Sequence, residues 1–162
     1  MAGHPKLDRI DLNILVQLQS DGAQTNLKLA QKVGLSPSPC LQRVKRLEDA
    51  GYISGYGARI NLSKLTDSVT VFTEVTLLGH RFDDFTKFEA NIRELSEVIE
   101  CHLVSGGYDY LLRFLAPSIA HYQARMESLL CRNIGIKSYF SYVVLKSPIV
   151  KSALPLNTLL ET

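Results

Sequence analysis

Apolar residues recur at helical intervals in the first third of the chain, which predicts three helices. One apolar face between Asp8 and Ser20 consists of residues four positions apart: Ile10, Ile14 and Leu18. A second face, after Thr25, consists of Leu29, Ala30 and Val33. A third face, after Ser36, repeats every three residues: Leu41, Val44, Leu47 and Ala50. We expect the three faces to share one small hydrophobic core.

Turn residues separate the second and third predicted helices. Thr25 or Asn26 can cap the second helix, and Gly34 can end it, because glycine adopts positive φ at low cost. Ser36 is placed to cap the third helix, whose first turn tolerates two prolines because its amides lack helical partners. Two helices around a short glycine turn form a helix-turn-helix. The glycine-rich stretch 51–60 alternates apolar residues and predicts a small β wing.

The rest of the chain alternates between strand and helix patterns. Strands are predicted at 69–78, 98–104, 110–116 and 136–146. Apolar residues at spacings of three and four predict one helix at 83–97 and another that begins after the capping residue Ser118. The resulting order βαββαβ is that of a ferredoxin-like sandwich, in which two helices cover one face of a four-stranded sheet.

The last predicted strand is apolar on both of its faces. One face has Tyr139, Val143 and Leu145, and the other has Phe140, Tyr142 and Val144. The open face of such a sheet is normally polar, so a second apolar face requires a partner surface. We therefore expect the sheet to self-associate in a homodimer.

The predicted fold class is α+β, with an N-terminal winged helix-turn-helix followed by a ferredoxin-like βαββαβ sandwich. Residues 1–60 are assigned to the winged helix-turn-helix domain, 61–67 to a linker, and 68–162 to the ferredoxin-like domain, whose sheet is expected to mediate oligomerisation. A length of 162 residues can hold two small domains, and 46% hydrophobic residues are enough for packed cores.

Several classes of protein are disfavoured by the same sequence. No apolar run approaches the roughly 20 residues of a membrane-spanning helix, and the first residues are too polar for a signal peptide. Three widely spaced cysteines, an odd number, indicate reduced thiols. We expect a cytoplasmic protein with no membrane partner.

Motifs for metals, cofactors and catalysis are not matched. The four histidines have no ligand-like spacing to each other or to the cysteines. The stretch 34–38 lacks the closing glycine and the preceding strand of a nucleophile elbow. The paired glycines near 55 and 106 do not complete a dinucleotide-binding or P-loop pattern. We expect no metal, no cofactor and no enzymatic activity.

Positive charge is concentrated in the first sixty residues. They contain eight Lys/Arg and five Asp/Glu, net +3, whereas residues 61–162 have a net charge of −1. A basic helix-turn-helix favours double-stranded DNA as a partner, although a solvated basic face on an ordinary helical hairpin would look similar. Lysines and arginines would neutralise phosphates, while serine and glutamine can reach base edges. The predicted DNA-binding residues are Thr25, Ser36, Ser38, Pro39, Gln42, Arg43, Lys45 and Arg46.

The turn between the second and third predicted strands is a candidate ligand site. Its residues are Ser105, Gly106, Gly107, Tyr108 and Asp109. The exposed amides of a two-glycine turn could bind the carboxylate of an amino acid, and Asp109 could bind its ammonium group. The alternative is a plain hairpin connection, in which Asp109 holds the turn together by hydrogen-bonding its own backbone.

Three stretches together resemble the Lrp/AsnC (feast/famine) transcription regulators: LDRIDLNIL, LSPSPCLQRVKRLEDAGYI and SGGYDYLLRF. The resemblance runs from Leu7 to about Leu160. It implies a winged helix-turn-helix followed by a ferredoxin-like domain that dimerises, often further into octamers. It also implies that an amino acid binds near the glycine turn, at an interface between dimers.

The resemblance also assigns roles to particular residues. Ser36 to Arg46 match the family's recognition helix, and Gly106 to Asp109 match its effector loop. Leu103 ends the preceding strand, where family members often line the pocket, and its apolar side chain favours an apolar amino acid.

Two other functions share this fold. An architectural DNA binder would have the same recognition helix and no effector. An enzyme resembling sirohaem decarboxylases would need haem-facing histidines or arginines and no DNA-reading helix, and the basic face of residues 42–46 disfavours it.

Overall fold

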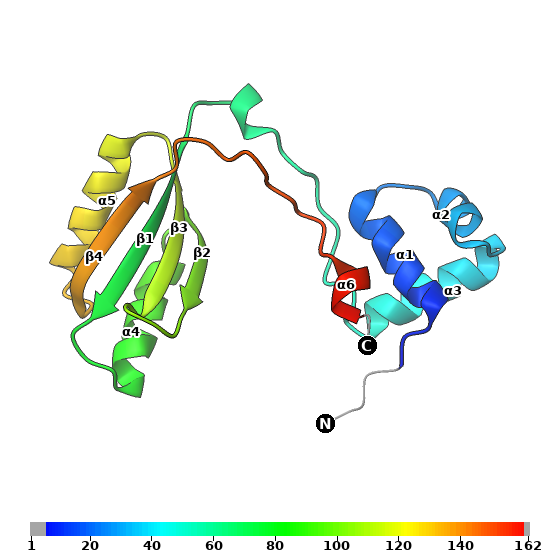
Figure 1. The fold of residues 1–162 in the computed structure, drawn as a ribbon, viewed down its shortest axis with the longest axis horizontal. Coiled ribbons are helices and arrows are strands. Elements are labelled where there is room, and N and C mark those ends of the chain that lie inside the picture. The colour runs from blue at the N-terminus through cyan, green and yellow to red at the C-terminus, as the bar shows by residue number, and fades with distance from the viewer. Residues whose placement is uncertain (1–5, 161–162) are drawn as a thin grey trace. The chain divides into compact units, whose positions relative to one another are not determined.

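The computed structural model describes residues 6–160 and divides the chain into two compact units (Figure 1). The first unit contains the residues up to Arg59 together with those from Ile149 onward, and the second is Ile60–Pro148. The sequence had assigned the end of the chain to the sandwich domain, whereas the contacts of 149–160 are with the first unit. Residues 1–5 and 161–162, at the ends of the predicted domains, lie outside the described residues.

Three helices and a short fourth one build the first unit: α1 (Arg9–Ser20), α2 (Asn26–Val33), α3 (Pro37–Asp49) and α6 (Leu156–Leu160). Asp8 caps α1 in a reciprocal capping box, and the Thr25 hydroxyl accepts the amide of Lys28 at the start of α2. Gly34 ends α2 with a φ of 71°, as its position in the turn predicted. The buried core of the unit consists of Ile14, Leu29, Ala30, Val33, Cys40 and Leu47.

The buried face of α3 differs from the predicted one. Leu41 is 57% exposed, and Cys40 is fully buried in its place. An α-helix advances 100° per residue, so Cys40, Val44 and Leu47 stay on one face, whereas a strict repeat of three drifts around the axis. Ser36 precedes the helix as expected, but its side chain makes no capping hydrogen bond.

The predicted β wing is absent from the described structure. Residues 53–60 belong to no helix or strand and form no ladder with another described segment. Tyr52 and Ile53 instead pack against the helical core, and the Tyr56 hydroxyl donates to Glu48 of α3 at 2.8 Å. The first apolar residues of this stretch therefore pack on helices, and the alternation was wrongly interpreted as a strand.

The second unit is the predicted ferredoxin-like sandwich. Four antiparallel strands, β1 (Val69–Leu77), β2 (Val98–Leu103), β3 (Tyr110–Ala116) and β4 (Ile136–Val143), form a sheet in the order β2-β3-β1-β4. Two helices, α4 (Phe82–Arg93) and α5 (Ile119–Cys131), cover one face of it (Figure 1). A short 3-10 turn, Leu62–Lys64, occupies the predicted linker.

The core of the second unit lies between the sheet and the two helices. It contains alternate residues of β1 and β3 with the buried faces of α4 and α5: Val71, Val75, Leu77, Phe88, Ile92, Tyr110, Leu112, Phe114, Tyr122, Met126 and Leu129. Ser118 caps α5 by accepting the amide of His121, as predicted. The helix expected at 83–97 ends earlier, at Arg93.

The opposite face of the sheet is open and partly apolar. In β4, Phe140 and Tyr142 are exposed, and they lie opposite Glu74 and Phe72 of β1. On the other side of β1, Leu111 of β3 is half-buried opposite Glu74. Self-association was predicted from an apolar surface on this face, and the two exposed aromatic rings provide such a surface.

Candidate functional site

The outer face of α3 carries three of the predicted DNA-binding residues. Ser38, Gln42 and Lys45 are exposed, and their spacing of four and three places them on one face, opposite Cys40. Ser36 and Pro39 are exposed at the start of the helix, and Thr25 is exposed at the start of α2. The Asn26 amide donates to the carbonyl of Pro37 at 2.8 Å, which ties the first turn of α2 to the first turn of α3.

The two predicted DNA-binding arginines lie on the flank of α3 that faces α1. Arg43 Nη1 donates to Asp8 Oδ2 at 2.7 Å and to Asp11 Oδ1 at 2.8 Å. Arg46 Nη2 donates to Asp11 Oδ2 at 2.5 Å. The Arg43 side chain is 27% exposed and that of Arg46 is 48% exposed. The structure thus separates Arg43 from the outer face and leaves Arg46 at its edge.

The carboxylates in these ion pairs, Asp8 and Asp11, lie at the start of α1. The pKa of Asp8 is lowered to about 2, first by the hydrogen bond from the Asp11 amide and then by Arg43. The hydrogen bonds of Arg43 to the carboxylates of Asp8 and then Asp11 raise the pKa of Arg43. Asp8 and Asp11 thus form the capping box of α1 and also pair with α3, and the sequence analysis did not predict this second role. The signal that could have revealed the second role is the spacing of Arg43 and Arg46, which aligns them along one flank of α3.

The glycine turn between β2 and β3 exposes its first residues. Ser105, Gly106 and Gly107 are exposed, and Tyr108 is half-buried. Gly106 has a φ of 157°, a conformation that glycine adopts readily. The predicted amide-rich turn is therefore accessible from solvent.

Asp109 is bound within its own unit. Its Oδ2 accepts the amide of Leu77 at 2.7 Å, and its Oδ1 lies 2.9 Å from His80 Nε2. Its own amide donates to the carbonyl of Val75, and its carbonyl accepts the amide of Val104. With a side chain only 17% exposed, Asp109 joins the turn to the end of β1. The role is structural, but the side chain binds the amide of Leu77 in β1 and not the backbone of its own turn, as the alternative prediction had it.

Leu103 lines a cavity that is separate from the glycine turn. It lines a cavity of about 490 Å³ with residues of α4, of the edge strand β2 and of its neighbour β3, including Glu89, Arg93 and Tyr110. The Tyr110 hydroxyl donates to Glu89 at 2.7 Å on one wall of it. None of the residues from Ser105 to Asp109 lines this cavity. The structure therefore does not bring Leu103 and the turn together in one pocket.

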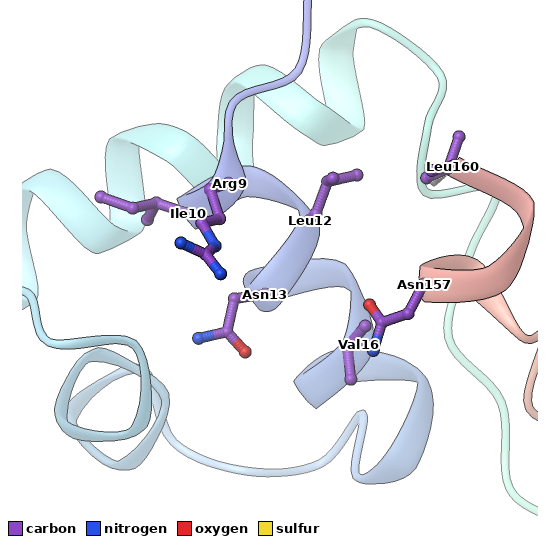
Figure 2. Close-up of a pocket in the computed structure, with 7 residues that line it drawn as sticks. All are labelled: Arg9, Ile10, Leu12, Asn13, Val16, Asn157 and Leu160. Carbon is purple, nitrogen blue, oxygen red and sulfur yellow. The ribbon is translucent and has the colours of Figure 1, made fainter. Parts of the chain in front are cut away.

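A further cavity, of about 600 Å³, lies in the first unit between α1 and α6 (Figure 2). It is lined by Arg9, Ile10, Leu12, Asn13, Val16, Asn157 and Leu160. Close by, the Gln19 side chain binds the backbone of Leu154 twice, since Nε2 donates to its carbonyl at 3.0 Å and Oε1 accepts its amide at 2.9 Å. Sequence reasoning missed this association because a five-residue helix carries no clear period.

The described residues can also be searched for a metal site and for a membrane-spanning helix, neither of which the sequence predicts. Within residues 6–160, no group of three or more acidic, histidine or cysteine side chains could hold a metal ion. No helix in the same part of the chain is long and apolar enough to cross a bilayer. The three cysteines are free thiols.

Comparison with protein families supports both halves of this arrangement. Residues 7–54 match a winged helix-turn-helix DNA-binding domain, and residues 70–154 match the Lrp/AsnC ligand binding domain. DoeX, a transcriptional regulatory protein of Halomonas elongata, is 46% identical to this chain. The matched region covers 88% of this chain and 90% of the length of DoeX. The leucine-responsive regulatory protein of Escherichia coli K12 is 46% identical over 86% of this chain and 85% of its own.

Solved structures agree with these sequence relatives. A Neisseria meningitidis transcriptional regulator in complex with L-Met is 35% identical and superposes with a TM-score of 0.89. The match covers 96% of this chain and 100% of the Neisseria chain. Escherichia coli AsnC is 25% identical, with a TM-score of 0.83 over 92% of this chain and 99% of its own. The sequence relatives are named as regulators and this chain itself matches a helix-turn-helix DNA-binding domain, so the enzyme alternative is set aside. The chain belongs to the Lrp/AsnC family of transcription regulators.

Proposed function

We propose that this regulator binds double-stranded DNA in a sequence-specific manner through the outer face of α3, and that an amino acid controls its DNA binding or assembly. The observation that carries the proposal is the exposed row Ser38, Gln42 and Lys45 on a helix held by a glycine turn. Such a row can enter the major groove, where glutamine and serine reach base edges and lysine reaches phosphate. Thr25, Ser36 and Pro39 surround the row. Arg46 lies at its edge, where it pairs with Asp11, and Arg43 is left out because it is directed towards α1.

The effector we infer is a small, apolar amino acid that binds the glycine turn at an interface between subunits. Exposed amides of Ser105 to Gly107 would bind its carboxylate, with Tyr108 beside its side chain, whereas Leu103 is left out because it lines a separate cavity. The L-Met complex of the Neisseria relative and the name of the leucine-responsive relatives support this ligand class. Asp109 supports the turn in this proposal instead of binding the ammonium group.

The assembly we infer is a homodimer that combines further into an octamer, in the cytoplasm where its DNA lies. The exposed aromatic residues of β4 support the dimer. A two-fold dimer would present two copies of α3 to successive major grooves. Because the effector site would lie between subunits, ligand binding and assembly would be thermodynamically linked.

The test is DNA binding with and without amino acids. Fluorescence anisotropy would compare the region upstream of the protein's own gene with scrambled DNA of equal length, adding each proteinogenic amino acid in turn. We expect tighter binding to the upstream region and a shift with an apolar amino acid. Equal affinity for both DNAs would disprove sequence-specific regulation, and specific binding without an amino-acid response would favour an effector-independent, architectural role.

Two variants locate the contact surface in the same assay. Gln42→Ala should reduce discrimination by about 1–3 kcal/mol if Gln42 reads a base. Lys45→Ala should weaken binding to every sequence and reduce the salt slope by about 0.9. Gln123→Ala, on the exposed side of α5 in the second unit, is the matched control and should change neither quantity.

A further inference from the structure

Asp11 is a charged side chain with no exposed surface. Its Oδ1 accepts Arg43 Nη1 at 2.8 Å, and its Oδ2 accepts Arg46 Nη2 at 2.5 Å and the amide of Asp8 at 3.1 Å. A buried carboxylate is tolerated when it is paired and hydrogen-bonded, and here both partners come from the recognition helix. Asp11 therefore connects the start of α1 to the middle of α3.

These contacts also remove positive charge from the face that meets DNA. Asp8 and Asp11 together offset the charges of Arg43 and Arg46. Of the three cations on α3, Lys45 alone has no ion pair with a described residue. A recognition helix with three free cations would bind phosphates of any sequence, because phosphate contacts carry no sequence information.

We propose that Asp11 is a positioning residue for DNA recognition. Its carboxylate holds Arg43 and Arg46 against α1, which fixes the rotation of α3 and limits the contacts that do not depend on sequence. The outer face left for DNA then consists of Ser38, Gln42 and Lys45. This inference rests on the proposed DNA-binding function and adds a residue that does not itself contact DNA.

The test uses the full chain with Asp11→Asn, which keeps the size of the side chain and removes its charge. We expect the two arginines to turn towards phosphates, so binding to scrambled DNA should tighten. The slope of log K against log salt should steepen by about 0.9 for each arginine released, up to roughly 1.8. The ratio of affinities for upstream and scrambled DNA should fall.

A structural role alone would give a different result. Glu97→Gln is the matched control, because Glu97 is also a nearly buried carboxylate with an arginine partner, Arg125, but lies in the second unit. It should lower the melting temperature and leave the salt slope unchanged. If Asp11→Asn behaves in the same way, with lower stability and unchanged slope and discrimination, the positioning role is wrong.

Two milder variants decide the question if Asp11→Asn does not fold. Asp8→Asn, at a half-exposed site, loosens Arg43 alone and should steepen the slope by less than one. Arg43→Gln should leave the slope as it is, because Arg43 does not contact phosphate in the native protein. A flat response to Asp8→Asn, or a shallower slope with Arg43→Gln, would overturn the inference. Failure of the native protein to bind any DNA would instead disprove the proposed function.

Discussion

Asp109 uses both carboxylate oxygens within its own unit, on the amide of Leu77 and on His80. The first contact bridges the end of β1 to the turn before β3, two segments far apart in the sequence. A buried amide that loses its acceptor must be desolvated without compensation. At the scale of single residues, this side chain therefore supports the geometry of the turn that we propose as the effector site.

Asp109→Ala should destabilise the protein by about 1–3 kcal/mol, because the Leu77 amide loses its acceptor. Asp109→Asn keeps an oxygen for that amide and should cost less. Thermal melting measures both, and calorimetry with amino acids reports the effector. If Asp109→Asn melts like the native protein but no longer binds the amino acid that the native protein binds, Asp109 contacts the ammonium group and the structural assignment is wrong.

Glu97 should make the stability of the second unit depend on pH. Hydrogen bonds from His121, its own backbone and Arg125 lower the pKa of Glu97 from its usual 4.5 to about 2. Because the folded pKa is depressed, this stabilisation is complete above about pH 4.5 and is lost as pH falls towards 2. Chemical unfolding between pH 7 and pH 2 should show this loss, and Glu97→Gln should flatten it. An equally steep fall in the Glu97→Gln variant would contradict the assignment.

At the scale of elements, the apolar repeat of α3 predicts the helix itself but not which of its faces is buried. The helix itself, its glycine turn and its uncharged first turn were all predictable from residue type, because backbone conformation there depends on local chemistry. The buried face was not, since Leu41 and Cys40 are adjacent and the choice between them depends on how α1 and α2 pack. The ion pairs of Arg43 and Arg46 were hidden for the same reason, because their partners are over thirty residues away.

Substituting each of the two leucines of α3 tests whether the predicted or the observed face of the helix is buried. Leu47→Ala should cost about 2–5 kcal/mol, because Leu47 is almost fully buried and its removal leaves a cavity. Leu41→Ala should cost less than about 1 kcal/mol, because more than half of Leu41 is already in water. Urea unfolding of both variants provides the comparison. Equal losses would mean that the predicted face, with Leu41 inside, is the correct one.

The order of strands and helices in the second unit was likewise predictable, because alternation and helical spacing are local signals. The wing was not, because apolar residues at 52 and 53 pack on a helical core. The effector site was predictable only as a turn. Its glycines mark an accessible backbone, while the second role of Asp109 depends on β1, which lies more than thirty residues earlier.

At the scale of the whole molecule, the open sheet face should determine assembly. Tyr142→Asp would place a charge in a face that we propose is buried between subunits, and an unpaired buried charge is strongly destabilising. We expect loss of the dimer and, with it, weaker DNA binding. Light scattering at micromolar concentration measures the mass, and Gln123→Asp on the exposed side of α5 is the control. A native protein that is monomeric under these conditions would contradict the assembly.

The division into units has a topological consequence. The chain leaves the helical unit after Arg59 and re-enters it at Ile149, so the sandwich is an insertion within its host. The two host segments meet where Arg59 Nη1 donates to Ser152 Oγ at 3.2 Å. Cutting the chain once, near residue 60, would thus leave the host without α6 and without the contacts of Gln19. Excising the insertion and closing the gap with a few glycines would keep both segments on one polypeptide, at the small entropic cost of a short loop.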